Sequence, residues 1–214
     1  MKKDCLILIL ILASVVSFAQ IKIEKPPTKK HGFHGIRFGV TASDYYRLPN
    51  EKFQQPLKKP NYKFHAGLIF DIINLKKFAS QIELSYVNKG SKEVFLEQNE
   101  EITVTSKLSY GQIDLIPIQI KPLGNRKFSP YISCGVYGAY LLSSKINYKV
   151  GNDFDRKLEF QNFNKKDYGF LINGGVKIET ISLEYRHEFG TKSIVPSTEL
   201  KNQLNNITLK LTTR

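Results

Sequence analysis

The chain has 214 residues, of which 41% are hydrophobic and 24% charged, and its lysines and arginines outnumber its aspartates and glutamates by 32 to 19. This length corresponds to one ordinary domain, and the apolar content, with 11 tyrosines and 14 phenylalanines, excludes a disordered or low-complexity chain. Two cysteines, Cys5 and Cys134, exclude a disulfide framework, and no Cys/His spacing indicates a zinc site.

The first residues predict export from the cytoplasm. Lys2 is followed by the apolar run 6–16, and 17–19 supplies small residues of the kind that a signal peptidase reads. The run is shorter than the ~20 apolar residues that a transmembrane helix needs. We therefore expect a signal peptide at 1–19. Export excludes nucleic acid as an expected partner, and the net charge of +13 favours anionic lipid headgroups or acidic glycans.

A lysine-rich segment follows, and we expect residues 20–33 to form a periplasmic N-terminal lead. Its lysines surround the pair Pro26 and Pro27, a composition typical of a flexible tail. Both a solvated leader and a docking arm fit this composition. The remaining residues, 34–214, are then the folded domain.

Within 34–214, apolar and polar residues alternate with the period of a β-strand. Ile36, Phe38 and Val40 share one face of the first such segment, and Arg37 lies on the opposite face. The same alternation, with Ile69 as a misfit, predicts about eight strands, the smallest common transmembrane barrel. The expected strands are 36–41, 62–72, 78–88, 108–121, 128–142, 168–178, 181–189 and 202–212.

The predicted connections are alternately long and short. The long ones are 43–61, 89–106, 143–167 and 191–201, and the short ones are 74–77, 122–127 and 179–180. A soluble β-sandwich has no reason to place every long loop at one end, whereas outer-membrane barrels do so. The sequence therefore predicts an all-β fold, an eight-stranded antiparallel transmembrane β-barrel with short periplasmic turns and long extracellular loops, in the cell outer membrane.

The two faces of the strands then have opposite environments. In lipid every backbone polar group must be paired, so the sheet closes and its apolar face points outward. The interior of an eight-stranded barrel is just wide enough for side chains to fill, so buried charges of both signs pair there and no open channel is expected. The expected interior charge network consists of Arg37, Lys63, His65, Glu83, Asp114, Lys177, Glu184, Arg186, Glu188 and Lys210.

One predicted strand changes phase along its length. Ile113 and Leu115 share a face, but Ile116, Ile118 and Ile120 continue one position out of phase. A β-bulge beside Pro117 restores the alternation, because one extra residue moves every later side chain to the other face. Proline also removes a ladder donor, which sheets tolerate at bulges and edges.

Several strings along the chain resemble the PorT-like family of outer-membrane β-barrel proteins. They are FHAGL (64–68), IELSYVNKG (82–90), IPIQIK (116–121), PYISCGVYGAYLL (130–142), YGFLINGGV (168–176) and LEYR (183–186). The resemblance covers nearly all of the mature chain and implies an OmpX-sized barrel in the outer membrane of a Gram-negative cell. It also implies a link to protein secretion or surface translocation, and it transfers no catalytic residue.

Enzymatic chemistry finds little support in the sequence. His187, with Ser193 and Glu188 nearby, is the candidate for a lipid-modifying triad of the kind that activates a serine nucleophile. Glu188 points to the opposite strand face from His187, which breaks such a triad. No Gly-rich phosphate loop or metal-ligand spacing is present. We expect no enzyme, no catalytic residue, no metal and no cofactor.

Function is then expected in the loops and the lead. The connection 143–167 mixes charges with aromatic residues, which can form a binding surface or extend the hairpin. The candidate binding-loop residues are Tyr148, Phe154, Arg156, Lys157, Phe160 and Phe163. Expected partners are outer-membrane lipid and lipopolysaccharide, and envelope or secretion-system proteins, with the barrel a monomer.

Three hypotheses follow from this reading. The first is a non-enzymatic surface protein, or an accessory to secretion or envelope assembly, without an open pore. The second is a soluble periplasmic barrel of the lipocalin kind, which would turn Phe38, Phe64 and Leu84 inward around an apolar ligand. The third is a lipid A-modifying outer-membrane enzyme that uses His187.

Overall fold

The computed structural model describes residues 32–46, 57–59, 61–97, 100–123, 127–150, 154–158, 163–196 and 200–213. The predicted signal peptide, and the predicted lead up to residue 31, lie outside these residues. All described residues belong to one compact unit, 31–214. None of its elements is a helix long and apolar enough to cross a membrane. The strands are β1 (Gly32–Tyr46), β2 (Leu57–Lys59), β3 (Asn61–Asn74), β4 (Phe78–Lys89), β5 (Lys92–Glu97), β6 (Glu100–Ile120), β7 (Phe128–Val150), β8 (Phe154–Leu158), β9 (Lys166–Ile178), β10 (Ile181–Ser193) and β11 (Lys201–Thr212).

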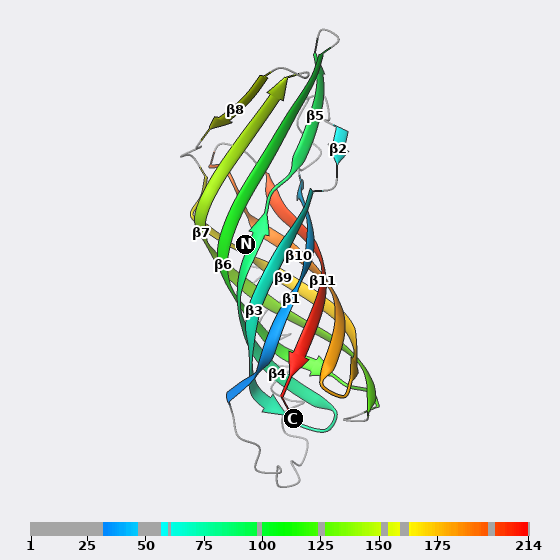
Figure 1. The fold of residues 1–214 in the computed structure, drawn as a ribbon. Coiled ribbons are helices and arrows are strands. Elements are labelled where there is room, and N and C mark those ends of the chain that lie inside the picture. Colours follow the sequence, from blue (N-terminus) through cyan, green and yellow to red (C-terminus); the bar gives the residue numbers. More distant parts are fainter. Residues whose placement is uncertain are drawn as a thin grey trace, which may run out of the picture. The chain divides into compact units, whose positions relative to one another are not determined.

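Eight of these strands form a closed ring (Figure 1). The order is β1, β3, β4, β6, β7, β9, β10 and β11, and β11 pairs back onto β1. Each neighbouring pair in the ring is antiparallel. The closing seam runs without interruption from Gly35↔Thr212 to Tyr46↔Lys201. The ring therefore has no unpaired edge over this length, and the predicted eight-stranded antiparallel barrel is confirmed.

Side chains alternate between the lumen and the outside along each strand, except at the register shifts. In β11, Asn206, Thr208 and Lys210 are buried in the lumen, whereas Ile207 and Leu211 are exposed. The outward-facing series of several strands end on exposed aromatic residues, as expected where a barrel wall meets the two membrane interfaces. These are Phe33, Phe78 and Phe128 at the end of the short turns, and Tyr62, Tyr86, Tyr140 and Tyr168 at the opposite end.

The connections at the end of the short turns agree with the sequence prediction. β3 joins β4 through residues 75–77, and β9 joins β10 through Glu179 and Thr180. Glu179 has a φ of 54°, the left-handed conformation that a tight turn between paired strands requires. The amide of Glu179 donates to the carbonyl of Lys127, which ties this turn to the connection before β7.

The long connections predicted at 89–106 and 143–167 contain strands over much of their length, which for 143–167 is the hairpin extension that the sequence also allowed. β6 and β7 pair from Ile120↔Ile132 up to Ile102↔Val150, far beyond the predicted strand ends at 108 and 142. β5 extends the sheet on one side of β6, and β8 extends it on the far side of β7. Both extensions keep the alternation, with Ile102 and Val104 of β6 and Tyr148 of β7 on one face, so the sequence analysis ended these two strands too early.

The predicted bulge at Pro117 is present. The register between β6 and β7 shifts between Leu115 and Ile118, and the register between β4 and β6 shifts between Ala79 and Gln81. As a result Ile116 is buried in the lumen, while Leu115 and Ile120 face outward. Ile69, the other departure from alternation, also points inward and is fully buried.

Gly39 makes the closing seam sensitive to side-chain volume. A Cβ atom at this position would overlap the backbone carbonyl of Ile207 and approach the Cα of Thr208 to 2.9 Å. We predict that Gly39→Ala lowers the free energy of unfolding by about 1–3 kcal/mol, because the paired strands must move apart. The measurement is the thermal midpoint of the mobility shift between folded and unfolded protein on gels. Gly138→Ala is the matched control, since a Cβ there meets no atom within 4 Å; equal midpoints for the two variants would contradict the prediction.

Candidate functional site

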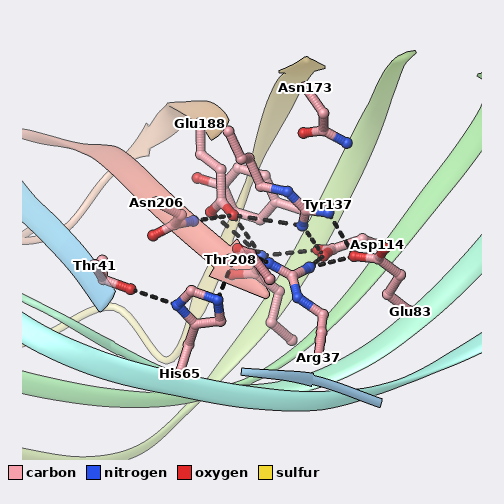
Figure 2. Close-up of polar contacts among 12 residues, drawn as sticks. Arg37, Thr41, His65, Glu83, Asp114, Tyr137, Asn173, Glu188, Asn206 and Thr208 are labelled. Carbon is pink, nitrogen blue, oxygen red and sulfur yellow. Dashed lines mark hydrogen bonds and ion pairs between the residues drawn. The ribbon is translucent and has the colours of Figure 1, made fainter. Parts of the chain in front are cut away.

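The centre of the lumen holds two arginines that share two carboxylates (Figure 2). The guanidinium of Arg186 donates to Asp114 Oδ2 and to Glu83 Oε2, each at 2.5 Å. Arg37, from β1, also pairs with Glu83 and lies 3.3 Å from Asp114 Oδ2. All four residues are at most 2% exposed. Each charge is therefore neutralised by opposite charges from other strands, which is the condition for burying it.

Lys210 and Glu184 extend this cluster along β11 and β10. Lys210 Nζ donates to Glu83 Oε1 at 2.8 Å and to Glu184 Oε2 at 2.6 Å. The hydroxyl of Tyr131 donates to the same Glu184 oxygen at 3.1 Å. Polar contacts thus connect β1, β4, β6, β7, β10 and β11 across the lumen.

Glu188 is linked to the cluster through amide side chains. Gln112 Nε2 donates to Asp114 at 2.8 Å and to Glu188 at 3.2 Å, and Asn206 Nδ2 donates to Glu188 at 3.2 Å. Arg186 Nη1 lies 3.9 Å from Glu188 Oε1. Glu188 therefore belongs to the interior charge network of the lumen.

Two remaining members of the predicted network, Lys63 and Lys177, lie apart from these charges, whereas His65 is linked to Arg37 through the hydroxyl of Thr208. His65 is held between Thr41 Oγ1 and Thr208 Oγ1, each 3.0 Å from one ring nitrogen. Lys63 lies at the extracellular end of β3 and donates to two backbone carbonyls. Lys177 lies next to the β9–β10 turn and is half-buried.

The sequence analysis also missed buried charges. Lys89 and Asp167 were placed in loops, but both are buried, and Lys89 Nζ donates to Asp167 Oδ2 at 3.0 Å. Lys89 Nζ also lies 3.7 Å from Glu188 and 4.1 Å from the ring centroid of Tyr137. Counting in steps of two from Glu83 reaches Lys89, so continuing the alternation to the end of each polar segment would have found them.

Apolar side chains also pack in the lumen; along β6, Leu108 and Tyr110 lie on the extracellular side of Asp114, and Ile116 lies on its periplasmic side. The apolar cluster consists of the buried residues Tyr45, Leu108, Tyr110, Ile116, Tyr137, Ala139, Leu171 and Ile194. Phe163 and Leu200, which lie in the connections before β9 and before β11, pack against it. Backbone hydrogen bonds of Asn164 to Ile194 and of Ile194 to Leu200 hold these two connections together. In the described residues, this apolar packing continues from the charged centre of the lumen toward its extracellular end.

His187 lies on the outer face of β10, on the opposite face from Glu188. Its Nδ1 is 2.6 Å from Asn205 Oδ1, its Nε2 is 3.3 Å from Gln203 Nε2, and its ring contacts Phe189 at 4.1 Å between centroids. Glu188 faces the lumen and is fully buried. The geometry therefore does not bring the two together in a triad. Within the described residues no group of three His, Cys, Asp or Glu side chains could hold a metal ion.

Beyond the ring, β2, β5, β6, β7 and β8 form a sheet at the extracellular end (Figure 1). We call it the extracellular sheet. Its lumen-side face carries a shallow groove of about 400 Å³, lined by Glu93, Phe95, Ile102, Val104 and Tyr148. Four of these five side chains are apolar or aromatic, and all are half-buried.

The structure places the predicted binding-loop residues in different surroundings. Tyr148 lines the groove of the extracellular sheet. Phe163 instead packs against the apolar cluster, because the chain before β9 turns in over the barrel mouth. Phe160, and the side chains of Phe154, Arg156 and Lys157, lie outside the described part of the structure.

Removing one carboxylate from the interior charge network should be strongly destabilising. We predict that Glu83→Gln lowers the free energy of unfolding by about 3–5 kcal/mol, because Arg37, Arg186 and Lys210 lose their shared anion in a buried site. The measurement is urea unfolding of the purified protein in lipid vesicles. Glu101→Gln is the control, since Glu101 is half-exposed, pairs with Lys59 at 3.5 Å, and should change stability by less than about 1 kcal/mol. Similar losses for both variants would show that burial of the network contributes nothing.

Comparison with known proteins gives one family. Residues 18–194 match the family model described as "Outer membrane protein beta-barrel domain". The comparison with curated protein sequences finds no match.

Three solved outer-membrane proteins to which this chain is similar are remote from it in sequence. Ail of Yersinia pestis, solved with the heparin analogue sucrose octasulfate, is 11% identical, with a TM-score of 0.39 over 86% of this chain and 98% of that one. OprG of Pseudomonas aeruginosa is 13% identical, with a TM-score of 0.46 over 86% and 95%. The outer membrane enzyme PagL is 10% identical, with a TM-score of 0.45 over 83% and 99%. The family match extends over well more than half of the sequence, so the chain belongs to the outer membrane protein beta-barrel domain family and is a protein of the outer membrane.

Proposed function

We propose that this protein is a non-enzymatic, monomeric outer-membrane barrel without an open pore that binds a protein partner of the cell envelope through its extracellular sheet. The observation that carries the proposal is the extension of β6 and β7 beyond the ring, where they present the groove around Tyr148. We further propose that the chain is organised as a signal peptide at 1–19, a periplasmic lead at 20–33 and the barrel domain at 34–214.

The apolar groove supports binding at this place. Phe95, Ile102, Val104 and Tyr148 are neither in the lipid-facing wall nor in the apolar cluster of the lumen. Apolar and aromatic side chains on a sheet outside the membrane are typical of the buried centre of a protein interface. The PorT-like strings of the sequence favour a partner in secretion or envelope assembly.

The lumen supports a role without transport. Buried ion pairs occupy its centre, and the apolar cluster continues from there toward its extracellular end. An eight-stranded barrel packed in this way leaves its surface as the place for function. A lipocalin-like role is disfavoured, because Phe38, Phe64 and Leu84 face outward.

Site-specific photocrosslinking in living cells tests the binding surface. We predict that a photoreactive phenylalanine analogue in place of Tyr148 yields a discrete crosslinked band, because this side chain lines the groove. The same analogue in place of Tyr140, which is exposed on the lipid-facing wall, is the control and should yield no protein crosslink. No band at Tyr148, or the same band at both positions, would reject the sheet as the binding surface.

Planar-bilayer recording tests the closed lumen. We predict no steady single-channel current for the purified wild-type protein, because side chains fill the lumen. A reproducible open level in the wild type would contradict the non-pore part of the proposal. Comparing the lipid A mass spectrum of parent, deletion and His187→Ala cells tests the non-enzymatic part, and a product missing in both altered strains would overturn it.

A further inference from the structure

A basic groove lies on the outer wall of the protein, on the face turned away from the lumen. It has a volume of about 520 Å³ and is lined by residues of β3, β4, β6 and β7. Tyr62 and Phe64 form its apolar side, and both belong to the lipid-facing series of β3. Lys63, Lys107 and Lys145 bring three ammonium groups to the same groove.

The lysines lie directly beyond the lipid-facing part of their strands. In β7 the outward-facing series runs from Ile132 through Tyr140 and Leu142. A register shift against β6 at this point changes the phase, and the outward series then continues with Lys145. In β6 it runs from Leu115 and Ile113 to Lys107. This order, apolar then aromatic then cationic, corresponds to acyl chains, interface and headgroups.

The arrangement of the lysines is unfavourable without a ligand. Lys107 and Lys145 are direct partners in the β6–β7 register and are both exposed on the outer face. Like charges directly opposite each other on neighbouring strands destabilise a sheet.

Among the described residues that line the groove, none carries a carboxylate. Glu101, on the same outer face of β6, is paired with Lys59 at 3.5 Å. Lys63 Nζ donates to the carbonyls of Lys89 at 2.8 Å and of Ser106 at 2.7 Å. An ammonium group has three N–H donors, so these bonds fix Lys63 in the groove and leave one donor for a ligand.

We propose that this groove binds a phosphate group of an anionic glycolipid in the outer leaflet of the outer membrane. The phosphate lies between Lys107 and Lys145 and converts their repulsion into two charge-assisted contacts. Lys63 contributes its free donor, and the acyl chains follow Tyr62 and Phe64 along the barrel wall. The proposal concerns the lipid-facing wall and is independent of any partner of the extracellular sheet.

Native mass spectrometry of the purified wild-type protein in neutral detergent, with lipid A as the probe, tests this site. We expect the double variant Lys107→Gln/Lys145→Gln to retain about tenfold less lipid A than the wild type, because each lysine near a membrane surface contributes severalfold to binding. Lys76→Gln/Lys77→Gln removes two exposed lysines from the β3–β4 turn and should bind lipid A as the wild type does. Lipid A from which the phosphates have been removed should bind both double variants and the wild type equally weakly.

Thermal stability supplies a second readout that a purely structural role of the lysines would not produce. In neutral detergent the Lys107→Gln/Lys145→Gln variant should unfold at a higher temperature than the wild type, because the opposed charges are gone. With lipid A the order should reverse. Equal retention of lipid A by the wild type and this variant, an unchanged order of melting temperatures, or binding of dephosphorylated lipid as tight as that of lipid A would overturn the proposal. Inorganic phosphate that binds the wild type as tightly as lipid A would also overturn the assignment to a lipid.

Discussion

The need to pair every backbone amide and carbonyl inside the hydrocarbon layer governs the structure of this protein. A sheet can meet that need only by closing on itself, and here the closure is the long antiparallel seam between β1 and β11. Closure then fixes two environments, because successive side chains of a strand point to lipid and to the lumen in turn. The polar half of every strand must find its partners within the lumen, which is narrow and enclosed by the barrel wall.

The interior charge network follows from this confinement. All four central residues of the network are buried: Arg37, Glu83, Asp114 and Arg186. Each charge is therefore stable only while its partners are present. Because the partners come from opposite sides of the ring, the ion pairs also fix the register in which distant strands can meet. A hydrophobic lumen of the same volume could be as stable, but it would place no such condition on register.

The outer surface shows how the same wall changes character along its length. Apolar residues give way to tyrosines and then, on β6 and β7, to the opposed pair Lys107 and Lys145. Beyond that point the two strands extend past the ring and form the extracellular sheet with β5 and β8. This sheet contains the groove around Tyr148. One long hairpin therefore contributes to the lumen, to the membrane interface and to the extracellular sheet.

The sequence by itself determined the class of fold, the strand faces, and the bulge at Pro117, because period-2 alternation is a local property that lipid on one side makes strict. Parity alone also placed Arg37, Glu83 and Arg186 correctly in the lumen, whereas Lys63, predicted there by the same rule, lines the groove on the outer wall. The sequence analysis ended β6 and β7 too early, because the segments beyond residues 108 and 142 contain many polar residues, although Ile102, Val104 and Tyr148 continue the alternation on one face. It also left Lys89 of β4 and Asp167 of β9 in loops. Which charges pair, that Phe163 turns inward over the lumen, and that Lys107 meets Lys145 were decided only by tertiary structure. These contacts join residues far apart in the sequence, and their partners depend on the strand register and ring closure that bring those residues together.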